Sequence, residues 1–272
     1  MKQLNIKEFF EQEKAKLKNT AKALDIQDKI KLGIIDATAE DDVANAIYIK
    51  KKVEDFQDRG WAVSIYKNKN TPEAIAEASE TCSAIIVQEP IAADAIPYDA
   101  SDIDAEKDVD GLSPMSEYWP ATPKGIIMYL NACGFDYKGK NAVVLGRSKI
   151  VGKPMARMLL DRDMNVTVLH SKTSAEDKAY YLAHADLVVA AVGKAGILTR
   201  EECPNAVVID VGINRVDGKL CGDFVENPAM TSDTVWSTPV PGGVGLLTRL
   251  ALMTNTLESA IFQFTDIDPD ID

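Results

Sequence analysis

Histidine is nearly absent from this chain, which has two, His170 and His184, in 272 residues. Histidine is the side chain that most often transfers protons near neutral pH, so its scarcity limits histidine-based catalysis. We therefore expect any proton-transfer group to be a lysine, a tyrosine or a carboxyl group with a shifted pKa. His170 ends an apolar run and is expected to be packed rather than catalytic.

Cysteine is also sparse, and no C-x-x-C pair occurs among Cys82, Cys133, Cys203 and Cys221. Together with the shortage of histidine, this spacing argues against a zinc site, and we expect no bound metal. Scattered single cysteines are typical of reduced, buried thiols in a cytoplasmic protein.

Long apolar runs and excess positive charge are missing as well. No apolar run approaches the roughly 18 residues that span a bilayer, and the opening segment MKQLNIKEFFEQEKAK lacks the apolar core of a secretory signal. The formal net charge of −12 argues against a nucleic-acid surface. We therefore expect no membrane or nucleic-acid partner, although a local basic site for a small anion remains compatible with this charge.

What the chain has is a series of short apolar runs rich in β-branched residues. Segments with helical periodicity separate most of them, which predicts βαβ units and mostly parallel sheets. The runs cover 31–35, 62–66, 84–88, 142–146, 166–169, 187–193 and 206–212. They are too many for one small sheet. We predict two α/β domains, the C-terminal one a Rossmann-type parallel sheet.

A loop-rich stretch at 89–123, with many prolines and acidic residues, interrupts the strands. We interpret it as the crossover from a first domain at 1–120 to a second domain at 121–245. A last helix is expected over 246–265, and the acidic tail 266–272 is expected to fray.

The segment AVVLGRSKIVGKP at 142–154 reads as a strand, a turn at Gly146 and a helix entered through Gly152. A helix N-terminus after such a turn can bind phosphate through backbone N–H groups. Ser148 stands where the usual dinucleotide motif has its middle glycine, and Arg147 lies inside the turn. A purely structural turn in a parallel sheet has a similar sequence, so the motif alone leaves both interpretations open.

The segment DDVANAIYIKKKVEDFQDRG predicts an amphipathic helix. Its apolar stripe is expected to comprise Ala46, Ile49, Val53 and Phe56.

Three consecutive lysines on this helix are not equivalent. Helical geometry directs Lys50 and Lys51 into solvent but places Lys52 on the shoulder of the stripe, beside Asn45 and Tyr48. A lysine against apolar surface loses solvation, which lowers its pKa toward the working range of a general acid or base. From this segment alone, a solvated lysine face is the alternative.

Several motifs occur here in one order: Y-x-x-x-K at Tyr48 to Lys52, I-I-V-Q ending at Gln88, and K-D-V-D-G at 107–111, followed by T-P-K-G at 122–125, the turn at 146–154 and T-P-V-P-G-G-V-G at 238–245. This combination resembles the methylenetetrahydrofolate dehydrogenase/methenyltetrahydrofolate cyclohydrolase family. The resemblance covers about residues 30 to 260. It implies two activities, oxidation of 5,10-methylenetetrahydrofolate and hydrolysis of the methenyl product to 10-formyltetrahydrofolate, in a folate cleft between the two domains.

The resemblance also assigns roles in the first domain. Lys52 lies over the one-carbon bridge as general acid or base, Gln88 hydrogen-bonds and tunes it, Tyr48 orients the ligand, and Asp110 binds the pterin. An Asx-turn before Gly111 is the alternative for Asp110. The last helix is expected to return to the first domain, and the protein is expected to form a homodimer.

In the second domain, the resemblance places the cofactor at six residues: Gly146, Arg147, Ser148, Val151, Ser171 and Ile213. The loop of Pro241, Gly242, Gly243 and Val244 is expected near the substrate; the alternative is a turn before the last helix. No acidic residue follows His170 until Glu176, whereas Arg147, Ser171 and Lys172 suit a 2′-phosphate. We therefore expect NADP, with NAD possible, although Ser171 and Lys172 also fit an ordinary polar loop.

The chain departs from the family pattern near the expected catalytic lysine. Asn45 stands where serine is usual, Glu89 and Ile91 interrupt the Q-L-P-L-P wording, and Leu246 replaces a proline. The charge of Glu89 is expected to raise the pKa of Lys52 or to alter folate affinity. Two rival functions remain: a dehydrogenase without the hydrolytic step, and a non-catalytic folate- or nucleotide-binding protein.

Overall fold

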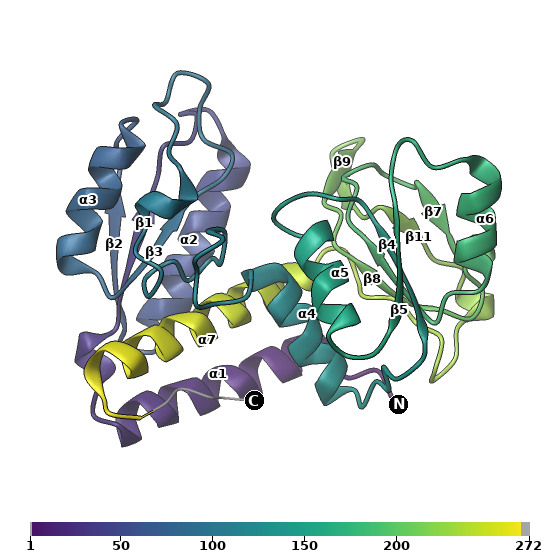
Figure 1. Cartoon of the computed structure of the whole chain (residues 1–272), viewed down its shortest axis with the longest axis horizontal. Helices are drawn as coiled ribbons and strands as arrows, with labels where there is room; N and C mark the ends of the chain where they lie inside the picture. The colour runs from purple at the N-terminus through teal and green to yellow at the C-terminus, as the bar shows by residue number, and fades with distance from the viewer. Residues whose placement is uncertain (1, 268–272) are drawn as a thin grey trace. The chain divides into compact units, whose positions relative to one another are not determined.

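The computed structural model describes residues 2–267 of the chain, and Figure 1 shows its ribbon. The chain divides into two compact units, which we describe separately. The three-stranded unit comprises Gln12–Ala121 with the described residues from Arg249 onward. The four-stranded unit comprises the described residues up to Glu11 with Thr122–Thr248. Two helices, α1 (Ile6–Ala23) and α7 (Val244–Phe264), contribute residues to both.

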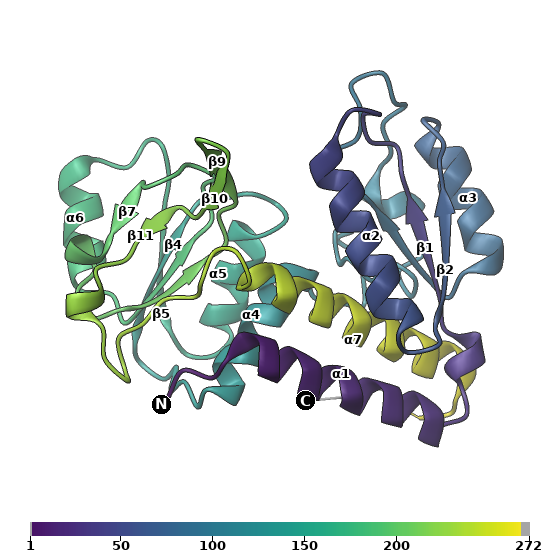
Figure 2. The ribbon, with the colours of Figure 1, turned by 180° about the vertical axis from the view of Figure 1, so that it is seen from behind.

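The three-stranded unit is built on a parallel sheet with the order β2-β1-β3. Its strands are β1 (Lys31–Ile35), β2 (Ala62–Tyr66) and β3 (Ala84–Val87), connected by α2 (Val43–Gln57) and α3 (Thr71–Thr81). The two crossovers run in opposite directions along the sheet, so right-handed connections place the two helices on opposite faces (Figure 2). The β3 strand and the middle of α7 are fully buried.

The four-stranded unit contains a parallel sheet with the order β5-β4-β6-β8. Its strands are β4 (Asn141–Leu145), β5 (Asn165–Leu169), β6 (Leu187–Ala190) and β8 (Val207–Asp210), and its helices are α4 (Ala121–Ala132), α5 (Gly152–Leu160) and α6 (Ala175–Ala183). The β6 and β8 strands are fully buried, whereas the edge strand β5 is only partly covered. This alternation of parallel strands and helices is the doubly wound arrangement expected from the sequence.

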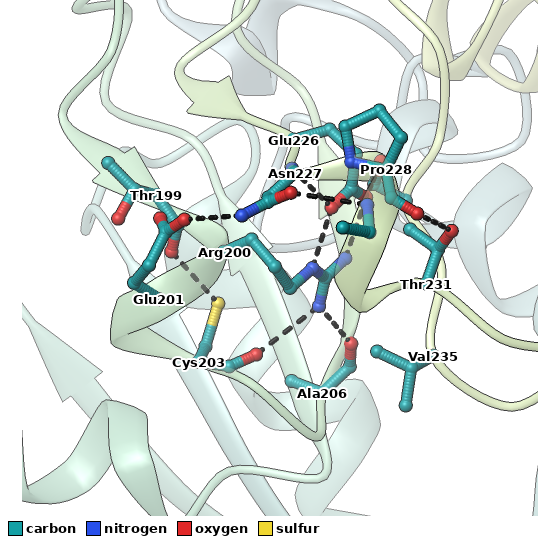
Figure 3. A network of polar contacts seen from close by, with 12 residues as sticks. Thr199, Arg200, Glu201, Cys203, Ala206, Glu226, Asn227, Pro228, Thr231 and Val235 are labelled. Atoms are coloured by element: carbon teal, nitrogen blue, oxygen red, sulfur yellow. Dashed lines mark hydrogen bonds and ion pairs between the residues drawn. The ribbon is translucent and has the colours of Figure 1, made fainter.

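Two small strand pairs complete the four-stranded unit: β7 (Leu198–Thr199) pairs with β11 (Phe224–Val225), and β9 (Asn214–Val216) pairs with β10 (Lys219–Cys221). The guanidinium of Arg200 is fully buried next to the first pair (Figure 3). It donates to both carboxylate oxygens of Glu226 at 2.7 and 2.8 Å, and to the carbonyl oxygens of Cys203 and Ala206 at 3.2 and 2.7 Å. With these partners, the buried charge is paired and hydrogen-bonded.

The observed elements confirm the predicted fold class, since each predicted apolar run contains a strand. The strands β7, β9, β10 and β11 were not predicted, because runs of two or three residues have no measurable periodicity. Residues 268–272 of the predicted acidic tail lie outside the described residues. Between residues 2 and 267, no helix combines the length and apolarity that crossing a membrane requires.

Candidate functional site

Helix α2 buries two residues of the predicted apolar stripe, Ile49 and Phe56, together with polar residues. Its buried residues are Asn45, Ile49, Lys52, Asp55 and Phe56. The prediction for Ala46 was wrong, since this residue is exposed, and Val53 is only half-buried. The face is rotated because Asp55 forms ion pairs with Lys14 and Arg249, which compensate its burial. Polar residues that find buried partners cannot be recognised from hydrophobic periodicity alone.

Lys52 lies inside the protein and not on a solvated lysine face. Its exposed fraction is 7%, whereas Lys50 and Lys51 are exposed as predicted. The Lys52 Nζ donates to Gln88 Oε1 at 2.9 Å and lies 5.6 Å from the ring centroid of Tyr48. Burial lowers the pKa of Lys52, and the nearby Asp110 carboxylate opposes this shift. A larger neutral fraction makes this amine a better general base.

Gln88 directly follows β3 and connects that strand to α2. Its Nε2 donates to Asn45 Oδ1 at 2.9 Å and to the carbonyl oxygen of Glu89 at 3.0 Å. With both amide hydrogens directed at acceptors, Gln88 presents its Oε1 to Lys52. The residue is almost fully buried, so these bonds fix its orientation.

Asp110 lies in the loop before α4 and interacts electrostatically with Lys52. Burial raises the pKa of the Asp110 carboxyl group, Lys52 lowers it, and Glu89 raises it further. The loop requires glycine at position 111, because φ is +68° there and a Cβ would lie 2.6 Å from the Pro120 nitrogen. It is Asp108, and not Asp110, whose carboxylate accepts a turn N–H, from Ser113 at 2.7 Å. Burial raises the pKa of Asp108 to about 6.

Glu89 has partners that the sequence did not predict. Its carboxylate accepts from the Tyr98 hydroxyl and from the Ile91 N–H, both at 3.1 Å. Its charge raises the pKa of Tyr98 and of Asp110. The negative group that raises the pKa of Lys52 is Asp110 and not Glu89, so of the two expected effects of Glu89 only an altered folate affinity stays a prediction.

In the four-stranded unit, the turn after β4 brings backbone atoms into close contact. Gly146 has φ +109°, and a Cβ on it would lie 2.3 Å from the Ala191 carbonyl oxygen. A Cβ on Gly152 would lie 2.3 Å from the Gly146 carbonyl oxygen. Ser148 Oγ accepts from the N–H groups of Val151 and Gly152 at 3.1 and 3.3 Å. Ser148 therefore satisfies two backbone N–H groups at the start of α5, which a glycine in its place cannot do.

Basic and hydroxyl side chains surround this turn. Arg147, Ser171 and Lys172 are exposed, and Ser171 and Lys172 follow the end of β5. His170 is half-buried, and its Nδ1 accepts from the Lys172 N–H at 3.2 Å. This bond ties the His170 ring to the loop backbone. Such a surface offers positive charge and hydroxyl donors to a phosphate.

Two buried carboxylates hold the loops that follow β6 and β8. Asp223 accepts from the backbone N–H groups of Val192, Gly193 and Lys194 at 2.7 to 2.9 Å. Asp210 accepts from the N–H of Gly212 and also from those of Asp223 and Phe224, all at 3.0 Å. Neither was predicted as a site residue, because their role depends on tertiary contacts.

Further predicted residues lie in neighbouring loops of this unit. Ile213 is exposed at the end of the segment after β8. In the loop before α7, Pro241 and Gly242 are exposed and Gly243 is buried, as is Val244, the first residue of α7. Among residues 2–267, no group of three or more histidine, cysteine or acidic side chains is arranged to bind a metal ion.

Comparison with known sequences gives consistent results. Residues 120–264 match the family model described as "Tetrahydrofolate dehydrogenase/cyclohydrolase, NAD(P)-binding domain". The bifunctional protein FolD of Variovorax paradoxus is 42% identical over 242 residues, which cover 80% of this chain and 83% of that protein. FolD of Albidiferax ferrireducens is 41% identical over 240 residues, with 81% and 83% covered.

Solved structures agree with these matches. The chain superposes with a TM-score of 0.85 on the bifunctional FolD dehydrogenase/cyclohydrolase of Campylobacter jejuni, at 32% identity and with 96% and 98% of the two chains covered. The Trypanosoma brucei methylenetetrahydrofolate dehydrogenase-cyclohydrolase, solved with NADP and an inhibitor, gives a TM-score of 0.82 at 28% identity, with 96% and 97% covered.

Proposed function

The chain belongs to the tetrahydrofolate dehydrogenase/cyclohydrolase family, and we propose that Lys52 is the acid–base group of its hydrolytic step. The protein is a bifunctional enzyme that oxidises 5,10-methylenetetrahydrofolate and hydrolyses the methenyl product to 10-formyltetrahydrofolate. The observation that supports the assignment to Lys52 is its buried amine, hydrogen-bonded to Gln88 and with a lowered pKa.

In our proposal, the three-stranded unit binds the folate and the four-stranded unit binds the cofactor. Asp110 accepts hydrogen bonds from the amino and ring N–H groups of the pterin. Tyr48, beside Lys52, packs against the ligand and orients it. The loop of Pro241, Gly242, Gly243 and Val244 also contacts the substrate.

Hydrolysis requires a water molecule to add to the methenyl carbon. The neutral Lys52 amine takes a proton from this water and returns it to the ring nitrogen whose bond to that carbon breaks. The other proton of the water is released, which balances the conversion of the cation to neutral 10-formyltetrahydrofolate. Gln88 keeps the amine oriented toward the carbon while the proton moves.

The cofactor is NADP, which accepts the hydride from the methylene bridge when bound. Gly146, Val151 and Ser148 form the turn that receives its pyrophosphate at the start of α5. The glycines keep this turn tight, because a Cβ on Gly146 or Gly152 would lie 2.3 Å from a backbone carbonyl oxygen. Arg147 and Ser171 would bind its 2′-phosphate, and Ile213 would contact its nicotinamide.

Two assays on the purified protein test this proposal. The first follows methylenetetrahydrofolate oxidation with NADP, and the second follows methenyl hydrolysis without cofactor. We expect both activities in the wild type. Lys52→Ala should reduce hydrolysis by roughly 10²-fold or more, the usual contribution of a general acid or base. Dehydrogenation should fall less, since it depends on positioning rather than proton transfer.

A hydrolysis rate that Lys52→Ala leaves unchanged would remove Lys52 from the mechanism. A wild type that oxidises but never hydrolyses the substrate would support the rival function, a monofunctional dehydrogenase. Lys50→Ala is the matched control, because Lys50 is exposed on the same helix. It should leave both rates within about twofold, as surface substitutions usually do.

We also propose a homodimer and a cytoplasmic location for this enzyme. All four cysteines are free, and three of them are buried, which fits a reducing compartment. Sedimentation of the purified protein measures the assembly, for which we expect twice the chain mass of 29.6 kDa.

A further inference from the structure

The buried amide of Gln88 is connected, through Asn45, to the first residue before α2. Asp42 caps this helix, and its Oδ1 accepts from the Asn45 N–H at 3.0 Å. Its second oxygen, Oδ2, accepts from Asn45 Nδ2 at 2.9 Å. Asn45 Oδ1 then accepts from Gln88 Nε2, and Gln88 Oε1 accepts from Lys52 Nζ, both at 2.9 Å.

The polarity of this chain of hydrogen bonds is set at the Asp42 end. A carboxylate only accepts hydrogen bonds, so the Asn45 amide must turn its Nδ2 toward Asp42. Its oxygen is then left facing Gln88, whose Nε2 must turn toward it. This orientation leaves an oxygen, and not an N–H group, facing the Lys52 amine. The carbonyl oxygen of Glu89 supports the same orientation of Gln88 at 3.0 Å.

We propose that Asp42 is a positioning residue for Lys52, acting through the Asn45 and Gln88 amides. This inference rests on the proposed role of Lys52 in hydrolysis. An oxygen facing Nζ stabilises its charged form and leaves the lone pair of the neutral amine free for the substrate. An N–H group facing Nζ would do the opposite: it would occupy that lone pair and disfavour the charged form.

Asp42→Asn tests the polarity without removing the helix cap, because asparagine caps as well as aspartate. Its new N–H group opposes Asn45 Nδ2 and favours reversal of both amides. We expect the kcat of methenyl hydrolysis to fall about tenfold, part of the roughly 10²–10⁴-fold that acid–base catalysis contributes. The KM should change little. The pH at which kcat reaches half its maximum should move down, because the charged form of Lys52 is destabilised.

The double variant Asp42→Asn/Asn45→Asp should restore most of the lost kcat. The carboxylate that this variant carries at position 45 accepts from both neighbours, so Gln88 again directs its oxygen at Lys52. The exchange also restores the net charge of the wild type. Asn70→Asp is the control, since Asn70 caps α3 of the same unit through the Glu73 N–H. This substitution should leave the pH profile unchanged.

An unchanged kcat and pH profile in Asp42→Asn would overturn the inference. Equal losses in the single and double variants, with no shift of the profile, would also overturn it, because they would show a purely structural role. Lys52→Ala is assayed in parallel. If hydrolysis survives in that variant, the proposed function of Lys52 fails first, and the two failures are thereby distinguished.

Discussion

At the scale of single residues, the site contains titratable groups whose pKa values are shifted by burial. Lys52 and Asp110 favour each other's charged forms, whereas burial shifts both pKa values toward the neutral forms. Burial thus brings the pKa of each group closer to neutral pH than its ordinary value. The protein thus has buried lysine and carboxyl groups with shifted pKa values, as expected from a sequence with so few histidines.

Arg147 gives a prediction at this scale. It is exposed in the turn after β4 and carries the positive charge proposed for the 2′-phosphate. Arg147→Ala should raise the KM for NADP by roughly tenfold, the loss of one charge-assisted contact. The KM for NAD, which has no such phosphate, should change far less.

Steady-state kinetics with both cofactors measures this difference. Equal increases in the two KM values would contradict the 2′-phosphate assignment. Arg215→Ala provides a control, because Arg215 is an exposed arginine in the same unit and donates to the Gly218 carbonyl oxygen.

At the scale of elements, the turn between β4 and α5 shows why the unusual sequence G-R-S works. Gly146 and Gly152 allow close backbone contact, while the Ser148 hydroxyl accepts from the N–H groups of Val151 and Gly152. These two hydrogen bonds explain the serine physically. The sequence shows that serine stands in place of the middle glycine, but only the structure shows which N–H groups this serine binds.

Gly152→Ala tests the close contact. The added Cβ would lie 2.3 Å from the Gly146 carbonyl oxygen, so the turn must shift. We expect a loss of about 1–3 kcal/mol in the free energy of unfolding and a clear rise in the KM for NADP. Denaturant unfolding and steady-state kinetics measure the two effects.

Gly139→Ala separates strain from cofactor binding. Unlike Gly152, Gly139 has a positive φ, +69°, and a Cβ there meets nothing within 4 Å. The variant should lose about 1 kcal/mol from backbone strain and keep the wild-type KM. If both variants raised the KM equally, the contact at Gly152 would not be what shapes the cofactor turn.

At the scale of the whole molecule, the sequence predicted the parallel sheets, because their strands and helices follow regular hydrophobic periods. It also pointed to Lys52 and Gln88 through motif order. It did not predict that α2 buries Asn45 and Asp55 in place of Ala46, since partners such as Lys14 and Arg249 come from distant parts of the chain. For the same reason, the roles of Asp42, Asp210 and Asp223 required the structure.

The proposed hydrolytic step depends on one property of the protein, a lowered pKa of Lys52. Nuclear magnetic resonance of ¹³C-lysine-labelled protein measures that pKa directly, and the Lys52 signal is assigned by its loss in Lys52→Arg. We predict a midpoint well below the ordinary value of 10.5, at the same pH where the hydrolysis rate rises as the amine becomes neutral. A Lys52 signal that titrates at the ordinary value, or a hydrolysis rate that does not follow it, would contradict the account.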